Sequence, residues 1–124
     1  MHTSIWTTTL PNLPQFRGGT LRAPTVVIGA GLTGLSVAYH LLSEQPHRQV
    51  IVLEANQVGS GASARSTGMI TPGVGQNLTA LVKRVGRDRA RDLYLETLQA
   101  VRYVSQLVEQ EQIDCQLQMG GQLI

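Results

Sequence analysis

The feature that most constrains this chain is a glycine-rich segment set between two strongly apolar runs. Residues 25–28 form a continuous β-branched run, and residues 50–53 form a continuous apolar run that is also rich in β-branched side chains. Between them, apolar side chains recur at three- and four-residue steps, as in an amphipathic helix; they are Leu32, Leu35, Ala38 and Leu42. Strand, helix and strand within thirty residues predict a βαβ unit with parallel strands. Because the two runs do not alternate with polar residues, we expect both strands to be buried on both faces.

The glycine-rich segment, residues 29–34, reads Gly-Ala-Gly-Leu-Thr-Gly and fits the GxGxxG dinucleotide fingerprint. Its first glycine permits a tight turn, its second lets a diphosphate approach the backbone, and its third lets the helix pack against the strand. The helix N-terminus adds N–H donors and the positive end of a dipole. The candidate cofactor-binding residues here are Gly29, Gly31, Leu32, Thr33 and Gly34.

An acidic residue, Glu54, follows the second strand and lies twenty residues after Gly34. The fingerprint places at this position a carboxylate that hydrogen-bonds the adenosine ribose. A carboxylate there disfavours the 2′-phosphate of NADP, so the pattern predicts NAD or FAD and does not separate them. The structural alternative is an ordinary strand–helix turn followed by a surface glutamate.

The rest of the chain divides around this unit. Residues 1–23 contain two prolines and few large apolar side chains, and predict an extended arm. Residues 24–77 hold the βαβ unit and a loop rich in glycine and serine from 55 onward. Residues 78–124 predict helices over 78–85 and 88–112, then a half-exposed strand over 113–118. A turn at Gly120-Gly121 leads into an apolar end.

Composition excludes several classes of function. The chain has 124 residues, ten Lys and Arg against eight Asp and Glu, one cysteine and five aromatic residues. A weak, dispersed positive charge with so few aromatics argues against nucleic-acid binding. No apolar run is long enough to span a membrane, and the one cysteine and three scattered histidines predict no metal site. We expect His40 to be structural, Cys115 to be a buried apolar residue, and the protein to be cytoplasmic.

Three segments together carry a family resemblance: VVIGAGLTGLSVAYHLL, VIVLEA and VGSGASARSTGMI. They resemble the FAD-dependent oxidoreductases of the D-amino-acid oxidase type, a family that includes glycine oxidase, sarcosine oxidase and gamma-glutamylputrescine oxidoreductase. Two shorter features resemble the last of these branches: Ser4-Ile5-Trp6 before a proline-rich arm, and Asp114-Cys115 leading to Gly120-Gly121. The resemblance covers residues 24–124.

The resemblance implies FAD as the cofactor and assigns further residues. The glycines of the fingerprint hold the FAD diphosphate and Glu54 holds the ribose. Residues on the glycine- and serine-rich loop pass the diphosphate and ribityl chain, and two more approach the isoalloxazine ring. The loop residues are Ser60, Ala62, Ser63 and Arg65, and the ring residues are Gly68 and Met69.

The resemblance also implies an activity: oxidation of a C–N bond in a small-molecule amine or amino acid, by hydride transfer to the flavin. The fold class expected is α/β, a Rossmann-like FAD-binding βαβ unit with following helices. Two parallel strands leave both sheet edges unpaired, so we expect an N-terminal fragment of a two-domain flavoprotein, whose missing C-terminal part is its partner. No catalytic residue is assigned. An NAD-binding module and a non-catalytic FAD-binding interaction protein remain as alternatives.

Overall fold

A computed structural model describes residues 13, 15, 16 and 18–121 of the chain. Most of the predicted arm, including Ser4-Ile5-Trp6, therefore lies outside the described residues. The chain forms two compact units, residues 1–67 and 68–124, and each is described by itself.

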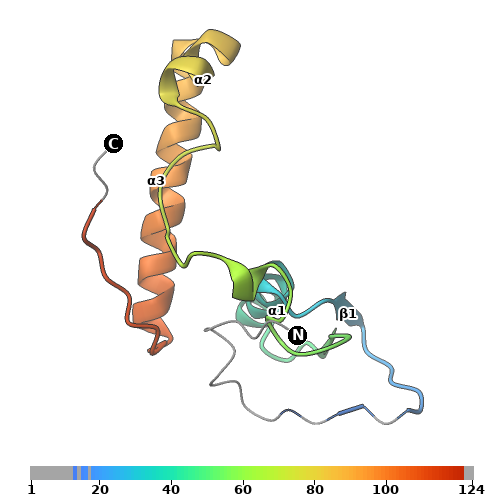
Figure 1. Cartoon of the computed structure of the whole chain (residues 1–124). Coiled ribbons are helices and arrows are strands. Elements are labelled where there is room, and N and C mark those ends of the chain that lie inside the picture. Colours follow the sequence, from blue (N-terminus) through green and yellow to red (C-terminus); the bar gives the residue numbers. More distant parts are fainter. Residues whose placement is uncertain (1–12, 14, 17, 122–124) are drawn as a thin grey trace. The chain divides into compact units, whose positions relative to one another are not determined.

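The first unit contains the predicted βαβ arrangement (Figure 1). Strand β1 (Thr25–Ile28) is followed by helix α1 (Leu32–Glu44) and strand β2 (Val50–Leu53). The strands pair in parallel, from Thr25 opposite Val50 to Ile28 opposite Leu53. The chain is thus α/β, with a two-stranded parallel sheet and helices. A short 3-10 helix, η2 (Ser63–Arg65), lies in the loop after β2, where the sequence predicts no regular structure.

The expectation that both strand faces are buried is wrong for this chain. Along β1 half-buried and exposed residues alternate, and Ile28 is 88% exposed. Helix α1 packs against both strands and covers them only in part. The buried residues of the unit are small: Ala30, Ala38 and Ala64.

The predicted apolar stripe of α1 is likewise only partly buried. Ala38 is buried, but Leu32, Leu35 and Leu42 are exposed. The helix lies close to the sheet at Gly34, where a Cβ would be 3.3 Å from Cγ1 of Val27. A contact through glycine and alanine brings the helix axis close to the strands and leaves the leucines at its margins.

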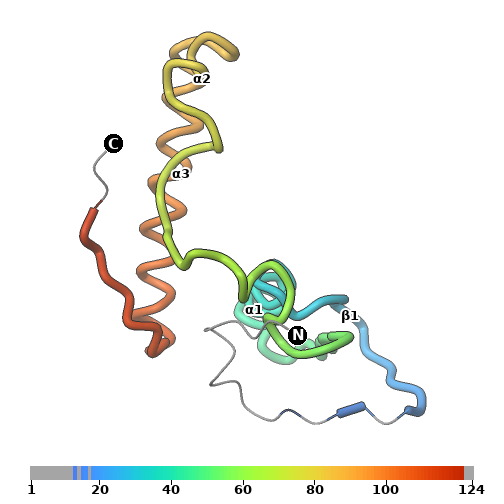
Figure 2. The backbone as a smooth tube through the Cα atoms, in the orientation of Figure 1, coloured from blue at the N-terminus to red at the C-terminus, as the bar shows by residue number. Residues whose placement is uncertain are grey.

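The second unit is a helical hairpin of α2 (Leu78–Val85) and α3 (Arg87–Gln110), which pack on each other. The backbone trace in Figure 2 follows the short link between them, where Gly86 has a φ of +82°. Asn77 caps α2 by accepting the N–H of Ala80 at 2.8 Å. Leu81 and Ala90 are buried. In the described part of the chain, no helix is long and apolar enough to cross a membrane.

After α3 the structure differs from the predicted strand over 113–118. The chain there is irregular and runs back beside α3 (Figure 1), with the Ser105 hydroxyl 3.3 Å from the sulfur of Met119. Gln112 and Gln116 have positive φ angles of 50° and 52°, which interrupt any extended conformation. Cys115 is exposed, not buried as predicted. The apolar end, residues 122–124, lies outside the described residues.

Candidate functional site

The segment of residues 29–34, here called the glycine turn, connects β1 to α1. Gly29 adopts a φ of +95°, a conformation that favours glycine, and donates its N–H to the carbonyl of Leu53 at 2.7 Å. Gly31 is the N-cap of α1, and its carbonyl accepts the first helical hydrogen bond, from Leu35 at 3.0 Å. The glycine turn therefore leaves β1 sharply and enters the helix at once.

Gly34 is required for a different reason, which is space. A Cβ built on it would collide with the backbone carbonyl of Gly29 and lie 3.3 Å from Val27. Because a carbonyl in a tight turn has little freedom to move, this position admits no side chain. The third glycine of the fingerprint thus has the packing role that the pattern predicts.

The carboxylate of Glu54 is hydrogen-bonded to the glycine turn. Its Oε2 accepts the N–H of Ala30 at 2.8 Å, and its Oε1 accepts the N–H of Asn56 at 3.0 Å. The Ala30 N–H, and after it the Asn56 N–H, lower the pKa of Glu54 below its ordinary value, against a smaller opposing effect of removal from water. Glu54 is therefore an anion at neutral pH, and it reaches the turn where the sequence predicts a ribose-binding acid.

The segment after Glu54, residues 55–67, also docks on the glycine turn and is called the docking loop. Gly59 donates its N–H to the carbonyl of Ala30 at 2.8 Å. The Ser63 hydroxyl accepts the N–H of Leu32 at 2.8 Å. The N–H of Ala64 bonds the carbonyl of Gly59 at 2.9 Å and closes the loop on itself. Backbone and side-chain bonds together hold the docking loop on the turn.

The geometry leaves hydrogen-bond donors at the mouth of the turn. Among the residues that the structure describes, the N–H groups of Gly31, Thr33 and Gly34 donate to no protein acceptor. Such N–H groups at a helix start suit an anion. Each oxygen of Glu54 also retains acceptor capacity after one backbone bond. The donors fit a diphosphate and the carboxylate fits a ribose diol, so the residues present suit a dinucleotide.

The other predicted site residues fall into two groups. Ser60 and Ala62 lie in the docking loop, where Ala62 accepts the N–H of Arg65 at 3.1 Å and the Arg65 side chain is exposed. Gly68 and Met69 belong to the second unit, and both are exposed. The structure thus groups the candidates up to Arg65 in one unit, and a flavin-ring role for Gly68 and Met69 stays a prediction.

Sequence reasoning missed three residues that organise the site. Ala30 is buried, with its N–H bound by Glu54 and its carbonyl by Gly59, while Asn56 holds the second oxygen of the carboxylate. All three act through backbone groups, which residue type does not reveal. The sequence offered one signal, a glycine at position 59, and the structure gives it a φ of +72°, as in a turn.

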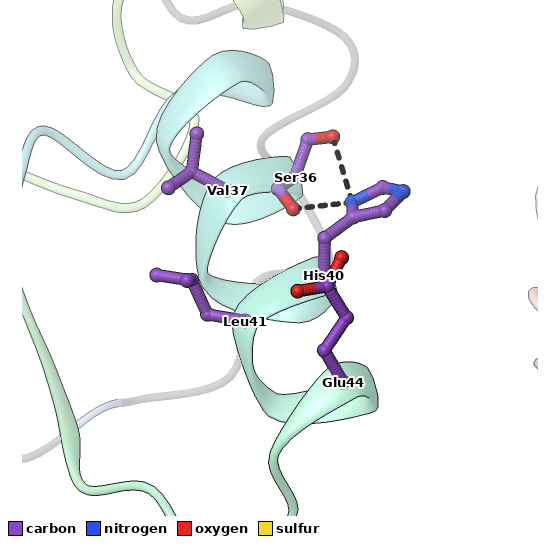
Figure 3. Close-up of a pocket in the computed structure, with 5 residues that line it drawn as sticks. All are labelled: Ser36, Val37, His40, Leu41 and Glu44. Atoms are coloured by element: carbon purple, nitrogen blue, oxygen red, sulfur yellow. Dashed lines mark hydrogen bonds between the residues drawn. The ribbon is translucent and has the colours of Figure 1, made fainter.

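A surface hollow of about 260 Å³ lies elsewhere on α1 (Figure 3). It is lined by Ser36, Val37, His40, Leu41 and Glu44. His40 places Nδ1 2.7 Å from the carbonyl of Ser36, one turn earlier in the same helix. This contact lies within α1 itself, in keeping with a structural role for His40. Among the described residues, no group of three or more His, Cys, Asp or Glu could hold a metal ion.

Comparisons with known proteins point to one family. Residues 25–124 match the family model described as "FAD dependent oxidoreductase". "Probable oxidoreductase OrdL" of Haemophilus influenzae is 37% identical over 98 residues, covering 79% of this chain and 22% of that protein. "Gamma-glutamylputrescine oxidoreductase" of Escherichia coli is 35% identical over 95 residues, covering 77% of this chain and 22% of that protein.

A further relative is "4-methylaminobutanoate oxidase (formaldehyde-forming)" of Paenarthrobacter nicotinovorans, 38% identical over 64 residues, with 52% of this chain and 8% of that protein covered. The chain therefore spans about a fifth of the length of the first two relatives. No solved structure matches this chain significantly.

Proposed function

This chain belongs to the FAD-dependent oxidoreductase family, and on that premise we propose that its glycine turn, Glu54 and docking loop hold the ADP half of FAD in a Rossmann-like site. The observation that carries the proposal is the 2.8 Å bond from the N–H of Ala30 to Glu54, which joins the two halves of the fingerprint. The donors of the turn and the acid at its mouth thus belong to one hydrogen-bonded arrangement.

Each part of the site has a distinct task. The N–H groups of Gly31, Thr33 and Gly34 donate to the diphosphate oxygens, with the dipole of α1 adding attraction for the negative charge. The remaining acceptor positions of Glu54 accept hydrogen bonds from the hydroxyl groups of the adenosine ribose. The same carboxylate repels a 2′-phosphate, which disfavours NADP.

The whole protein, on this proposal, oxidises a C–N bond of a small-molecule amine or amino acid. Support comes from the family and from relatives named for gamma-glutamylputrescine and 4-methylaminobutanoate. Bound FAD supplies the hydride acceptor. The residues of this chain bind and orient the cofactor. A cytoplasmic location stays a prediction.

The test measures binding of ADP to the chain by calorimetry, with Glu54→Gln as the variant and Glu44→Gln as the matched control. Glu44 makes the same change in charge on the same unit, at the exposed end of α1. We expect Glu54→Gln to weaken ADP binding by about tenfold, the scale of one hydrogen bond to a charged group, and Glu44→Gln to leave it unchanged. Equal ADP affinity of the two variants would contradict the proposal.

The same titration tests one of the two alternatives, an NAD-binding module. FAD and NAD share the ADP half, but the docking loop is rich in glycine and serine and offers small residues near the diphosphate. We expect FAD to compete with ADP more strongly than NAD does. Stronger competition by NAD than by FAD would support the NAD-binding module instead.

A further inference from the structure

We propose that Ser63 is a positioning residue that caps helix α1 from the docking loop, and that Gly31 lacks a side chain because the Ser63 hydroxyl occupies that space. The fingerprint explains its second glycine by the approach of the ligand. In this chain the protein itself already uses the position. Only the consequence for nucleotide binding rests on the function proposed above.

The first observation is that α1 begins without a cap of its own. Its N-cap residue is Gly31, which has no side chain to accept a helical N–H. Ser63, thirty-one positions after Leu32, supplies the missing acceptor, with its hydroxyl oxygen 2.8 Å from the Leu32 nitrogen. Serine is among the preferred capping residues because its oxygen satisfies one of the unpaired N–H groups of the first turn. Here the cap comes from a distant segment.

The second observation concerns the backbone of Gly31. Its φ of −81° and ψ of −176° form an extended conformation that any residue adopts. Backbone conformation therefore does not require glycine here. A Cβ on Gly31 would lie 3.1 Å from the hydroxyl oxygen of Ser63, the nearest atom to it, so the hydroxyl would have to move by a few tenths of an ångström. The protein atom that a side chain at residue 31 would displace is thus the capping hydroxyl.

The third observation is that Ser63 is held in place by its own helix. It opens η2, which is closed by the bonds from Ala64 to Gly59 and from Arg65 to Ala62. Ala64 is 7% exposed and anchors that helix. The hydroxyl is therefore presented to α1 by a short, ordered element, and loss of the hydroxyl should loosen the docking loop at this end.

The first experiment follows amide hydrogen exchange in the chain without nucleotide. In Ser63→Ala we expect the Leu32 amide to exchange about fivefold faster, the size of an ordinary serine cap. The Ala30 amide, bound by Glu54, should keep its protection. Ser63→Thr retains the hydroxyl and should restore protection at Leu32, and Gln57→Ala, at an exposed position of the same loop, is the control. Unchanged Leu32 exchange in Ser63→Ala would overturn the cap.

The second experiment is a double-mutant cycle with Gly31→Ala. Alone, this change should push the hydroxyl away and speed Leu32 exchange by about fivefold. Added to Ser63→Ala, it should change Leu32 exchange by less than about twofold, because the atom it displaces is gone. An equal effect of Gly31→Ala in both backgrounds would show that the two positions do not share the space, and would overturn the pairing.

The nucleotide consequence is measured by ADP binding in the same variants. We expect Ser63→Ala to weaken ADP binding by a few-fold, since the loosened loop must be ordered on binding. If Leu32 loses protection while ADP affinity stays at the wild-type value, the cap is supported and the proposed nucleotide site fails. The two results are thus read separately.

Discussion

The two units of the chain are organised by different physical means. In the first, residues 1–67, the site is built from small residues and hydrogen bonds: Glu54 and Ser63 each accept an N–H of the glycine turn, and the buried residues are alanines. In the second, residues 68–124, amphipathic helices pack through Leu81 and Ala90, and Asn77 caps α2. One unit is held at a turn and the other along a helix face.

The difference has a consequence for how each unit fails. Packing is graded, because a truncated side chain leaves a cavity whose cost depends on how far the neighbours relax. The glycine turn has no such latitude at Gly34, since an added Cβ there meets the backbone carbonyl of Gly29. Substitutions in the first unit should therefore act on ligand binding, and those in the second on stability.

The largest effect is expected at Gly34. In a helix, Gly→Ala ordinarily adds stability through propensity, but here the new Cβ collides with the carbonyl of Gly29. We expect Gly34→Ala to distort the glycine turn and abolish measurable ADP binding, followed by calorimetry. Gly61→Ala is the control, because a Cβ there meets nothing within 4 Å. ADP binding by Gly34→Ala at wild-type strength would refute the steric argument.

The second unit should respond most to Leu81, which is 4% exposed on α2. Truncation in Leu81→Ala leaves a cavity against α3, and we expect a loss of about 2–3 kcal/mol in the stability of the hairpin. Amide exchange along α3 measures it. Leu95→Ala, at a position 46% exposed, should cost well under half as much. Similar costs at the two positions would mean that the hairpin has no packed interior.

A smaller effect is expected at Asn77, whose side-chain oxygen caps α2 through the N–H of Ala80 at 2.8 Å. Removal of the oxygen in Asn77→Ala should cost about 1 kcal/mol, with fraying confined to the first turn. Asn77→Ser keeps an acceptor and should retain most of the protection of the Ala80 amide. If the Ala80 amide were equally protected in the two variants, the side-chain cap would not contribute to the stability of α2.

Much of the local structure was predictable from the sequence. The strands at 25–28 and 50–53 and the helix at 78–85 are confirmed, because apolar period and the flanking glycine or asparagine determine them locally. The helix predicted over 88–112 is observed over Arg87–Gln110. The position of Glu54 beside the glycine turn also follows from spacing, since parallel strands in register bring residue 54 next to residue 29.

What could not be predicted depends on partners distant in sequence. The exposure of Ile28 and Leu32 reflects which elements cover the sheet, and no local pattern contains that information. The strand expected at 113–118 failed because alternation alone does not report the positive φ of Gln112 and Gln116. Ser63 and Gly59 each contact a residue of the glycine turn that lies about thirty positions earlier in the chain. Both contacts involve backbone groups of the turn.

The smallest expected effect comes from protonation of Glu54 at low pH, with the second unit as the reference. Backbone N–H groups, Ala30 first, hold the pKa of Glu54 in the folded chain below its ordinary value of 4.5. Its contribution to holding the turn is therefore complete above pH 4.5 and is lost as the pH falls through the lower, folded value. Because the carboxylate is partly exposed, solvent screens the effect and keeps it small.

The measurement is the amide chemical shift of Ala30 between pH 7 and 3, with Ala90 in the second unit as an internal reference. In the wild type the Ala30 shift should move at a pH below 4.5, as Glu54 takes up its proton, while Ala90 does not follow. Glu54→Gln removes the titrating group and should flatten the curve, whereas Glu44→Gln should leave it intact. A wild-type curve in Glu54→Gln would show that the acid response of the turn originates elsewhere and that Glu54 is not the group holding Ala30.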